Sequence, residues 1–169
     1  MDDMRQTAIF RHIKGFFRRK NKIVILSPLE GRIVPLKEVP DKVFAEEVMG
    51  KGLAIIPDTG ILFSPIKGRV DSVANAKHAI VCVSEDGVEI LIHIGIDTVT
   101  LKGVPFSPMV KAGDWVEPGD ILAKFNIAAI KAADFSTVSP VLVTNFDEFG
   151  SLSFASGFAK PGDALITMN

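Results

Sequence analysis

Hydrophobic residues occur in short runs from residue 23 onward, and Gly, Pro and Asp residues separate these runs. The runs are rich in Val, Ile and Leu, which favour strands, and turn residues bound each of them. We therefore predict an antiparallel all-β sandwich or barrel with few short helices. The predicted strands are residues 23–26, 32–34, 53–56, 69–73, 79–83, 88–94, 121–125, 141–144 and 164–167. A helix is predicted at residues 126–133, where Asn126 can cap the first turn.

The chain contains an internal repeat. Residues 27–34 read SPLEGRIV, and residues 64–71 read SPIKGRVD. A second repeated pattern, KAGD, EPGD and KPGD, occurs at residues 111–114, 117–120 and 160–163, each time shortly before an apolar run. The repeats predict one β-domain over residues 23–169, built by duplication from two similar halves.

Residues 1–22 have a different character. They hold seven of the 19 Lys/Arg residues and two of the 20 Asp/Glu residues, a net charge of +5, so the remaining 12 and 18 give −6. Within residues 4–20, Ile and Phe recur at helical spacing, which predicts a short basic amphipathic tail. Contact of this tail with an anionic membrane surface, and a solvated tail or linker, are both left open. The acidic body suits a partner with a basic docking face and not nucleic acid.

The single cysteine, Cys82, cannot form an internal disulfide and lies in an apolar run. We expect it to be a buried small hydrophobic residue and not a nucleophile. The chain also lacks a long uncharged apolar stretch and a signal-peptide pattern, which together predict a cytoplasmic location.

Two of the three histidines flank a predicted hairpin. Asp86-Gly87 is a strong two-residue turn signal between apolar runs. With this loop, His93 faces Ile80, and His78 lies two residues farther along the same strand. Both histidines then share one sheet face, with Cα atoms about 7–8 Å apart. A loop one residue longer would reverse the faces, so the prediction depends on register. The residues predicted to face the core are Val81, Val83, Ile90, Ile92 and Ile94.

Paired imidazoles on a semi-apolar face suit phosphoryl transfer. A neutral imidazole is a good nucleophile and a good leaving group, so it can carry a phosphoryl group reversibly. A second imidazole can stabilise the phosphoryl oxygens, while an apolar rim excludes water. Two other interpretations stay open from the pair alone: a metal site, for which two histidines are too few ligands, and two surface histidines without a role.

The run at residues 87–99, GVEILIHIGIDTV, resembles the active-site strand of the glucose-type enzyme IIA (EIIA) family of the bacterial phosphoenolpyruvate:sugar phosphotransferase system. Three more segments agree in order: VPDKVFAE at 39–46, KHA at 77–79 and PVLVTN at 140–145. The resemblance covers roughly residues 23–168, which is far more specific than one short motif.

The resemblance implies a phosphocarrier. His93 matches the histidine that is phosphorylated by the histidine-containing phosphocarrier protein (HPr), and His78 matches the one needed to pass the group to enzyme IIB of the IIB/IIC sugar permease. Gly95 matches the residue whose backbone carbonyl orients the phosphorylated ring. Asp41 and Asp97 match acidic positions that meet an arginine of the donor. The resemblance implies no cofactor. The positions that match the apolar docking rim are Val43, Phe44, Val48, Leu91 and Val99.

The chain departs from the family pattern at two places. The family often has Thr two residues before the second histidine, whereas this chain has Ala76. Rim positions that are often aromatic are aliphatic here, as at Leu91 and Ile94. The first change removes a polar contact within the site, and the second is expected to alter the choice of partner.

Three alternatives differ in their chemistry. Residues 110–120 have the turn spacing of a biotinyl or lipoyl carrier domain. Such a domain needs a lysine at a hairpin tip, often within Met-Lys-Met or Asp-Lys-Ala, and the chain contains neither tripeptide. A zinc hydrolase would need a third strong ligand beside the two histidines. The family resemblance implies a different zinc site, in which a carboxylate of a partner protein completes the coordination by His78 and His93. A regulatory protein that reports its phosphorylation state would use the same histidines.

Overall fold

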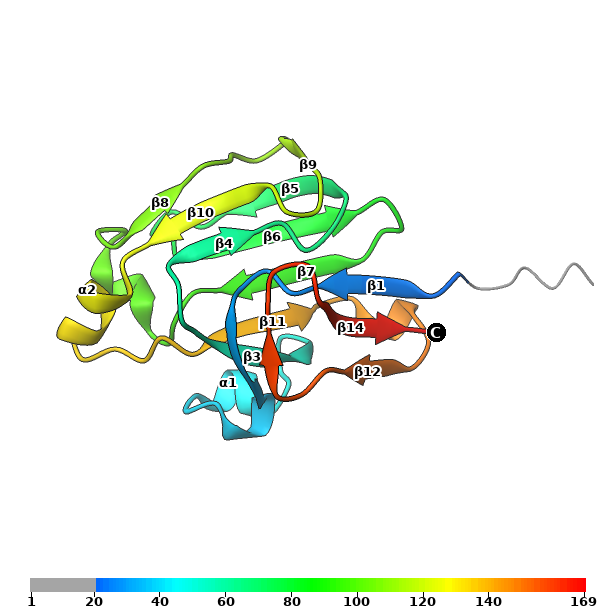
Figure 1. Ribbon diagram of the computed structural model, residues 1–169, viewed down its shortest axis with the longest axis horizontal. Coiled ribbons are helices and arrows are strands. Elements are labelled where there is room, and N and C mark those ends of the chain that lie inside the picture. Colours follow the sequence, from blue (N-terminus) through cyan, green and yellow to red (C-terminus); the bar gives the residue numbers. More distant parts are fainter. Residues whose placement is uncertain (1–20) are drawn as a thin grey trace, which may run out of the picture.

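The computed structural model describes residues 21–169 (Figure 1). The amphipathic segment 4–20, with its predicted membrane contact, lies outside these residues. The largest sheet has eight strands in the order β13 (Phe158–Ala159), β2 (Gly31–Pro35), β3 (Lys51–Pro57), β11 (Ser139–Val143), β7 (Glu89–His93), β6 (Ala79–Ser84), β5 (Gly68–Val73) and β9 (Trp115–Val116). Two three-stranded sheets are β1 (Ile23–Leu26), β14 (Ala164–Met168), β12 (Leu152–Phe154), and β4 (Ile61–Phe63), β10 (Ile121–Phe125), β8 (Phe106–Pro108).

Helices are few and short within residues 21–169, and the strands pair antiparallel, so the predicted all-β fold is confirmed. The helical segments are α1 (Lys42–Ala45), α2 (Ile127–Ala132) and the 3-10 helices η1 (Leu36–Glu38), η2 (Thr98–Leu101) and η3 (Phe146–Glu148). The predicted helix at 126–133 corresponds to α2, whose N-cap Asn126 accepts a hydrogen bond from the Ala129 N–H at 2.9 Å. Helix α1 was not predicted.

The main core lies between the eight-stranded sheet and the two smaller sheets. It joins Ile55 and Ile92 of the large sheet with Ile25, Leu62 and Leu122 of the small ones, and each is at most 2% exposed. Burial of one such side chain is worth roughly 1.5–3 kcal/mol. The opposite face of the large sheet carries a smaller cluster, which η1 and α1 cover. The cluster consists of Val34, Leu36, Val39, Phe44, Ala54, Ala79, Leu91, Ile96 and Leu142.

The internal repeat has a structural counterpart. The hydroxyl of Ser27 donates to the carbonyl of Leu29 at 2.8 Å, and that of Ser64 donates to the carbonyl of Ile66 at 2.8 Å. The two segments also bind each other reciprocally, because the Leu26 N–H donates to Pro65 at 3.0 Å and the Phe63 N–H donates to Pro28 at 2.9 Å. The two halves therefore meet at equivalent residues.

The three Gly-Asp turns are alike in detail. In each, the aspartate carboxylate accepts a hydrogen bond from the backbone N–H three residues earlier, at 2.8–2.9 Å. Gly113, Gly119 and Gly162 of these turns all have φ near +90°, a conformation that glycine adopts at little cost. The aspartates are Asp114, Asp120 and Asp163.

The predicted hairpin register is wrong by one residue. His93 pairs with Ala79, not with Ile80. The Ser84 N–H donates to the Val88 carbonyl at 2.9 Å, so the loop between them contains Glu85 as well as Asp86-Gly87. This change moves Val81 and Val83 to the outer face of the sheet, where both are partly exposed. Ile90, Ile92 and Ile94 lie in the core as predicted, whereas Ile80 and Cys82 take the core positions predicted for Val81 and Val83.

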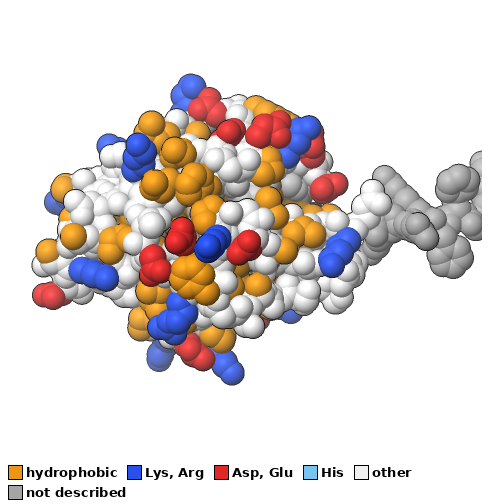
Figure 2. All heavy atoms as spheres, viewed as in Figure 1, with side chains coloured by type: hydrophobic (Ala, Val, Ile, Leu, Met, Phe, Trp, Pro, Cys, Tyr) orange, Lys and Arg blue, Asp and Glu red, His pale blue; other side chains and the backbone are white. Residues whose placement is uncertain are grey.

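On the face shown in Figure 2, acidic and basic side chains are intermingled with hydrophobic ones, and neither charge forms a large patch. No helix within residues 21–169 is long and apolar enough to cross a membrane.

Candidate functional site

His93 is the last residue of β7 and lies on the outer face of the large sheet. Along β7, Ile90 and Ile92 enter the main core, while Leu91 packs in the smaller cluster on the opposite face. The period of two along a strand places the His93 side chain on the Leu91 side. Its ring contacts the Phe44 ring edge-on, with centroids 5.1 Å apart.

His78 reaches the same place from outside strand β6. It directly precedes β6, and its carbonyl accepts a hydrogen bond from the Ile94 N–H at 2.7 Å. Lys77, with φ of 61°, turns the chain just before it. The His78 and His93 rings meet edge to face, with centroids 4.8 Å apart and planes inclined by 77°. The predicted convergence of the two imidazoles is therefore present, although the register from which it was inferred is wrong.

The backbone after β7 fixes the orientation of the His93 ring. Nδ1 of His93 lies 2.7 Å from the carbonyl oxygen of Gly95. A carbonyl oxygen can only accept, so Nδ1 carries the proton and Nε2 has the free lone pair. Gly95 has φ of +72°, and a Cβ there would lie 2.6 Å from Cγ2 of Thr98 and 2.7 Å from the carbonyl oxygen of Ser136. Only glycine fits this position without movement of the loop.

Both imidazoles are neutral near pH 7. Burial lowers the pKa of His93, an effect partly offset by the Gly95 carbonyl; the neighbouring His78 lowers it further, while Asp41 and Asp97 raise it. Burial also lowers the pKa of His78. Neutral His93 keeps the nucleophilic lone pair on Nε2.

Helix α1 brings Phe44 to the site, and Asp41 determines where this helix begins. The Asp41 carboxylate accepts hydrogen bonds from the N–H groups of Val43 at 2.8 Å and Phe44 at 3.4 Å. Asp41 is thus the N-cap of α1 as well as a charge that acts on His93.

The other residues of the predicted rim differ in exposure. Val43, Val48 and Val99 are 44%, 68% and 50% exposed, whereas Phe44 and Leu91 are 5% and 7% exposed and pack in the smaller cluster. Asp97 is exposed at the N-terminus of η2, and its side chain makes no capping hydrogen bond.

A family profile described as phosphoenolpyruvate-dependent sugar phosphotransferase system, EIIA 1, matches residues 23–149. The chain belongs to this family. Its chemistry is accordingly that of a phosphotransferase component of a sugar transport system, and the resemblance stated from the sequence is confirmed.

Relatives of this EIIA chain cover nearly its whole body. A glucose-specific EIIA component of Staphylococcus aureus is 44% identical over 86% of this chain and 88% of that protein. A β-glucoside-specific EIIBCA component of Bacillus subtilis is 44% identical over 86% of this chain, which spans only 24% of that larger protein. The solved structure of glucose permease IIA from Mycoplasma capricolum has a TM-score of 0.81 and 34% identity, covering 86% of this chain and 95% of that one.

Within this EIIA site, one polar atom lacks a partner. Nδ1 of His78 is buried and accepts or donates no hydrogen bond among residues 21–169. Ala76, two residues earlier in the chain, carries no hydroxyl. An unpaired acceptor is less costly than an unpaired N–H, so neutral His78 carries its proton on Nε2.

Two buried hydroxyl groups also contact the site, and the sequence analysis did not identify them. Ser139 accepts from the Gly95 N–H at 3.1 Å, and Thr98 donates to the Ile94 carbonyl at 2.5 Å. Both residues lie within mostly apolar segments, and nothing in the local pattern distinguishes their hydroxyls from other strand or turn residues.

The described residues offer no complete metal site. Across residues 21–169, no group of three or more His, Cys, Asp or Glu side chains converges as metal ligands. A metal ion on His78 and His93 would need a further ligand.

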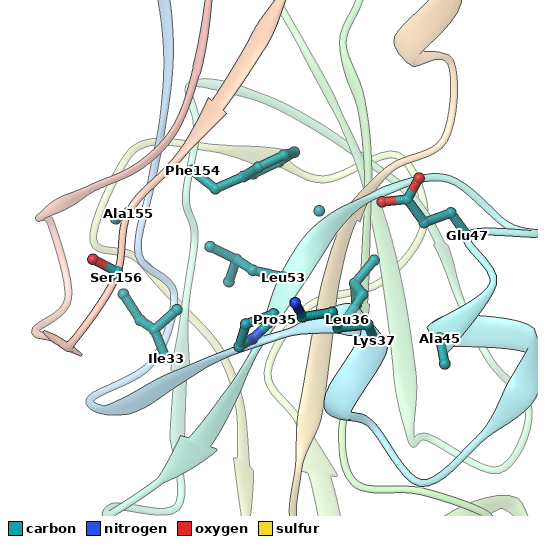
Figure 3. A pocket seen from close by; sticks show the side chains of 11 residues that line it. Ile33, Pro35, Leu36, Lys37, Ala45, Glu47, Leu53, Phe154, Ala155 and Ser156 are labelled. Carbon is teal, nitrogen blue, oxygen red and sulfur yellow. The ribbon is translucent and has the colours of Figure 1, made fainter.

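A separate apolar groove of about 260 Å³ lies between β2, β3, β12 and the α1 region. Phe154 and Leu53 line this groove together with Ile33 and Leu36 (Figure 3). Neither His78 nor His93 lines it, so the groove is separate from the histidine pair.

Proposed function

We propose that this EIIA chain accepts a phosphoryl group from HPr on Nε2 of His93 and passes it to enzyme IIB for sugar uptake. The observation that supports this proposal best is the His93 ring itself: its Nδ1 lies 2.7 Å from the Gly95 carbonyl oxygen, which leaves the lone pair on Nε2, and its centroid lies 4.8 Å from that of the His78 ring. No cofactor is needed.

The proposed transfer balances without a redox step. The Nε2 lone pair of His93 attacks phosphorus while the donor's N–P bond breaks and its electron pair returns to the donor imidazole. The proton stays on Nδ1 of His93 and is donated in a hydrogen bond to the Gly95 carbonyl, which stabilises the positive charge that develops on the ring. His78, with its proton on Nε2, donates a hydrogen bond to a phosphoryl oxygen. For delivery, a nucleophile of enzyme IIB attacks the phosphorus while the Nε2–P bond breaks and its electron pair returns to the His93 ring.

The proposed docking surface combines apolar and acidic groups. Val43, Val48 and Val99 are exposed side chains that can exclude water from the N–P bond. Asp41 and Asp97 can each bind an arginine on the donor through charge-assisted hydrogen bonds. The net charge of −6 over residues 23–169 favours association with a basic partner face.

The test is phosphoryl transfer with purified components. Incubation with labelled phosphoenolpyruvate, enzyme I and HPr should add one acid-labile phosphoryl group to the chain. His93→Ala should abolish the label, whereas His78→Gln should keep it but impair transfer to enzyme IIB. Full labelling of the His93→Ala variant would refute the assignment.

The proposed location is the cytoplasm, with residues 4–20 in contact with the inner face of the membrane. Sedimentation of the full chain with vesicles of anionic lipid tests this contact, which neutral vesicles should not support.

A further inference from the structure

The loop after β7 contains two consecutive peptide groups, one of which binds His93, and all four of their polar atoms have partners. In the peptide between Ile94 and Gly95, the carbonyl accepts from Thr98 Oγ1 at 2.5 Å and the N–H donates to Ser139 Oγ at 3.1 Å. In the next peptide, the Gly95 carbonyl accepts from His93 Nδ1 at 2.7 Å, and the Ile96 N–H donates to the Ser136 carbonyl at 3.0 Å.

Ser139 has a fixed hydroxyl orientation. Its hydroxyl proton goes to the Thr137 carbonyl at 2.9 Å, which leaves a lone pair for the Gly95 N–H. Ser139 and Thr98 are both 0% exposed. Removal of the Ser139 hydroxyl would therefore leave the Gly95 N–H buried without an acceptor, because water cannot reach it to replace the hydroxyl.

Glycine makes the loop dependent on this hydroxyl. Gly95 has φ of +72° and Asp97 has φ of 58°, so this segment depends on its hydrogen bonds to keep its conformation. Since glycine can adopt more φ and ψ values than other residues, an unpaired Gly95 N–H would turn toward another acceptor. The Gly95 carbonyl would then move away from the His93 ring.

We propose that Ser139 is a positioning residue for His93. It binds the Gly95 N–H, keeps the Gly95 carbonyl in line with Nδ1 and thereby holds the imidazole in the tautomer whose Nε2 is nucleophilic. This proposal rests on the proposed function, in which Nε2 of His93 takes the phosphoryl group.

The test compares Ser139→Ala with Ser64→Ala. Ser64 is a matched control because it is 2% exposed, donates to the Ile66 carbonyl at 2.8 Å and accepts from the Ile66 N–H at 3.5 Å, and it belongs to the repeat, not to the His93 loop. Two quantities are measured on the folded proteins: the tautomer of His93, from two-bond ¹H–¹⁵N ring correlations, and the rate of phosphorylation by phospho-HPr.

We expect Ser139→Ala to lose the Nδ1–H tautomer as the dominant form and to be phosphorylated about tenfold more slowly. Ser64→Ala should change neither quantity, and Ser139→Thr, which keeps the hydroxyl, should restore both. If Ser139→Ala does not fold, Ser139→Cys gives the same readout, since sulfur is a weaker acceptor of similar size.

An unchanged tautomer in folded Ser139→Ala or Ser139→Cys would overturn the positioning role. A wild-type chain that HPr does not label at His93 would instead overturn the proposed function, and the tautomer measurement would still decide the role of Ser139.

Discussion

Substitution of Gly95 by alanine tests the link between backbone and chemistry most directly. An added Cβ would lie 2.7 Å from the Ser136 carbonyl oxygen and 2.6 Å from Thr98 Cγ2, so the loop must shift. The shift moves the Gly95 carbonyl, which is 2.7 Å from Nδ1 of His93. We expect Gly95→Ala to be less stable and to accept the phosphoryl group more slowly.

The magnitude has two parts. Alanine at φ of +72° costs about 1–2 kcal/mol relative to glycine. Weakening of the hydrogen bonds from His93 Nδ1 to the Gly95 carbonyl and from the Ile96 N–H to the Ser136 carbonyl costs about 1 kcal/mol each. The expected loss in free energy of unfolding is thus about 3–4 kcal/mol, measured by urea unfolding. The phosphorylation rate, measured on the folded variant, should fall at least tenfold.

Gly157 provides the matched control. It has φ of +88°, and an added Cβ there meets nothing within 4 Å. Gly157→Ala should therefore carry only the conformational cost, about 1–2 kcal/mol, and keep the wild-type rate. If Gly95→Ala were as stable as Gly157→Ala and equally fast in phosphorylation, the ring-orienting role of the Gly95 carbonyl would be refuted.

Three further predictions concern Asp41, the histidines and Cys82. Asp41→Ala should lower the free energy of unfolding by about 1 kcal/mol through loss of the α1 cap; Asp41→Asn should keep that stability but raise KM for HPr, and equal KM values for Asn and wild type would argue against a charge contact. Burial lowers the pKa of His93 and His78 in the folded chain, so the unfolded chain binds more protons below about pH 6.5. The free energy of unfolding should therefore be highest above that pH and fall below it. Urea unfolding between pH 5 and 8 should show a smaller fall in His93→Gln than in the wild type. Burial, with a smaller contribution from the Asp71 charge, raises the pKa of Cys82 to about 12, so an aromatic disulfide reagent should label it only in urea, and rapid labelling of the native chain would contradict this.

The strand pattern was predictable from the sequence because each strand has its own hydrophobic run. Strands β1 and β10 begin and end where the runs 23–26 and 121–125 do. Short edge strands such as β13 have too few residues to show a period, and α1 spans only Lys42–Ala45 and depends on the Asp41 cap, so neither was predictable from periodicity.

The hairpin register could not be read from Asp86-Gly87 because distant residues influence the loop. Asn145 donates to the Gly87 carbonyl at 2.9 Å and accepts from the Glu89 N–H at 2.9 Å, across more than 50 residues of sequence. Gly87, with φ of +83°, ends a three-residue loop of a common type. A local turn signal identifies where the chain reverses, but it does not fix which residues pair.

The asymmetry between the two repeated halves explains where the site lies. Strands β2 and β5 begin with equivalent sequences, yet residues 36–50 connect β2 to β3, whereas only residues 74–78 connect β5 to β6. The long connection contains α1, which covers the outer sheet face and places Phe44 against His93. The short connection ends with His78. The backbone turns at Lys77, directly before it, and the His78 ring contacts the His93 ring. Duplication thus supplies a rigid frame common to both halves, and the unequal connections bring together, over one sheet, the groups that surround His93.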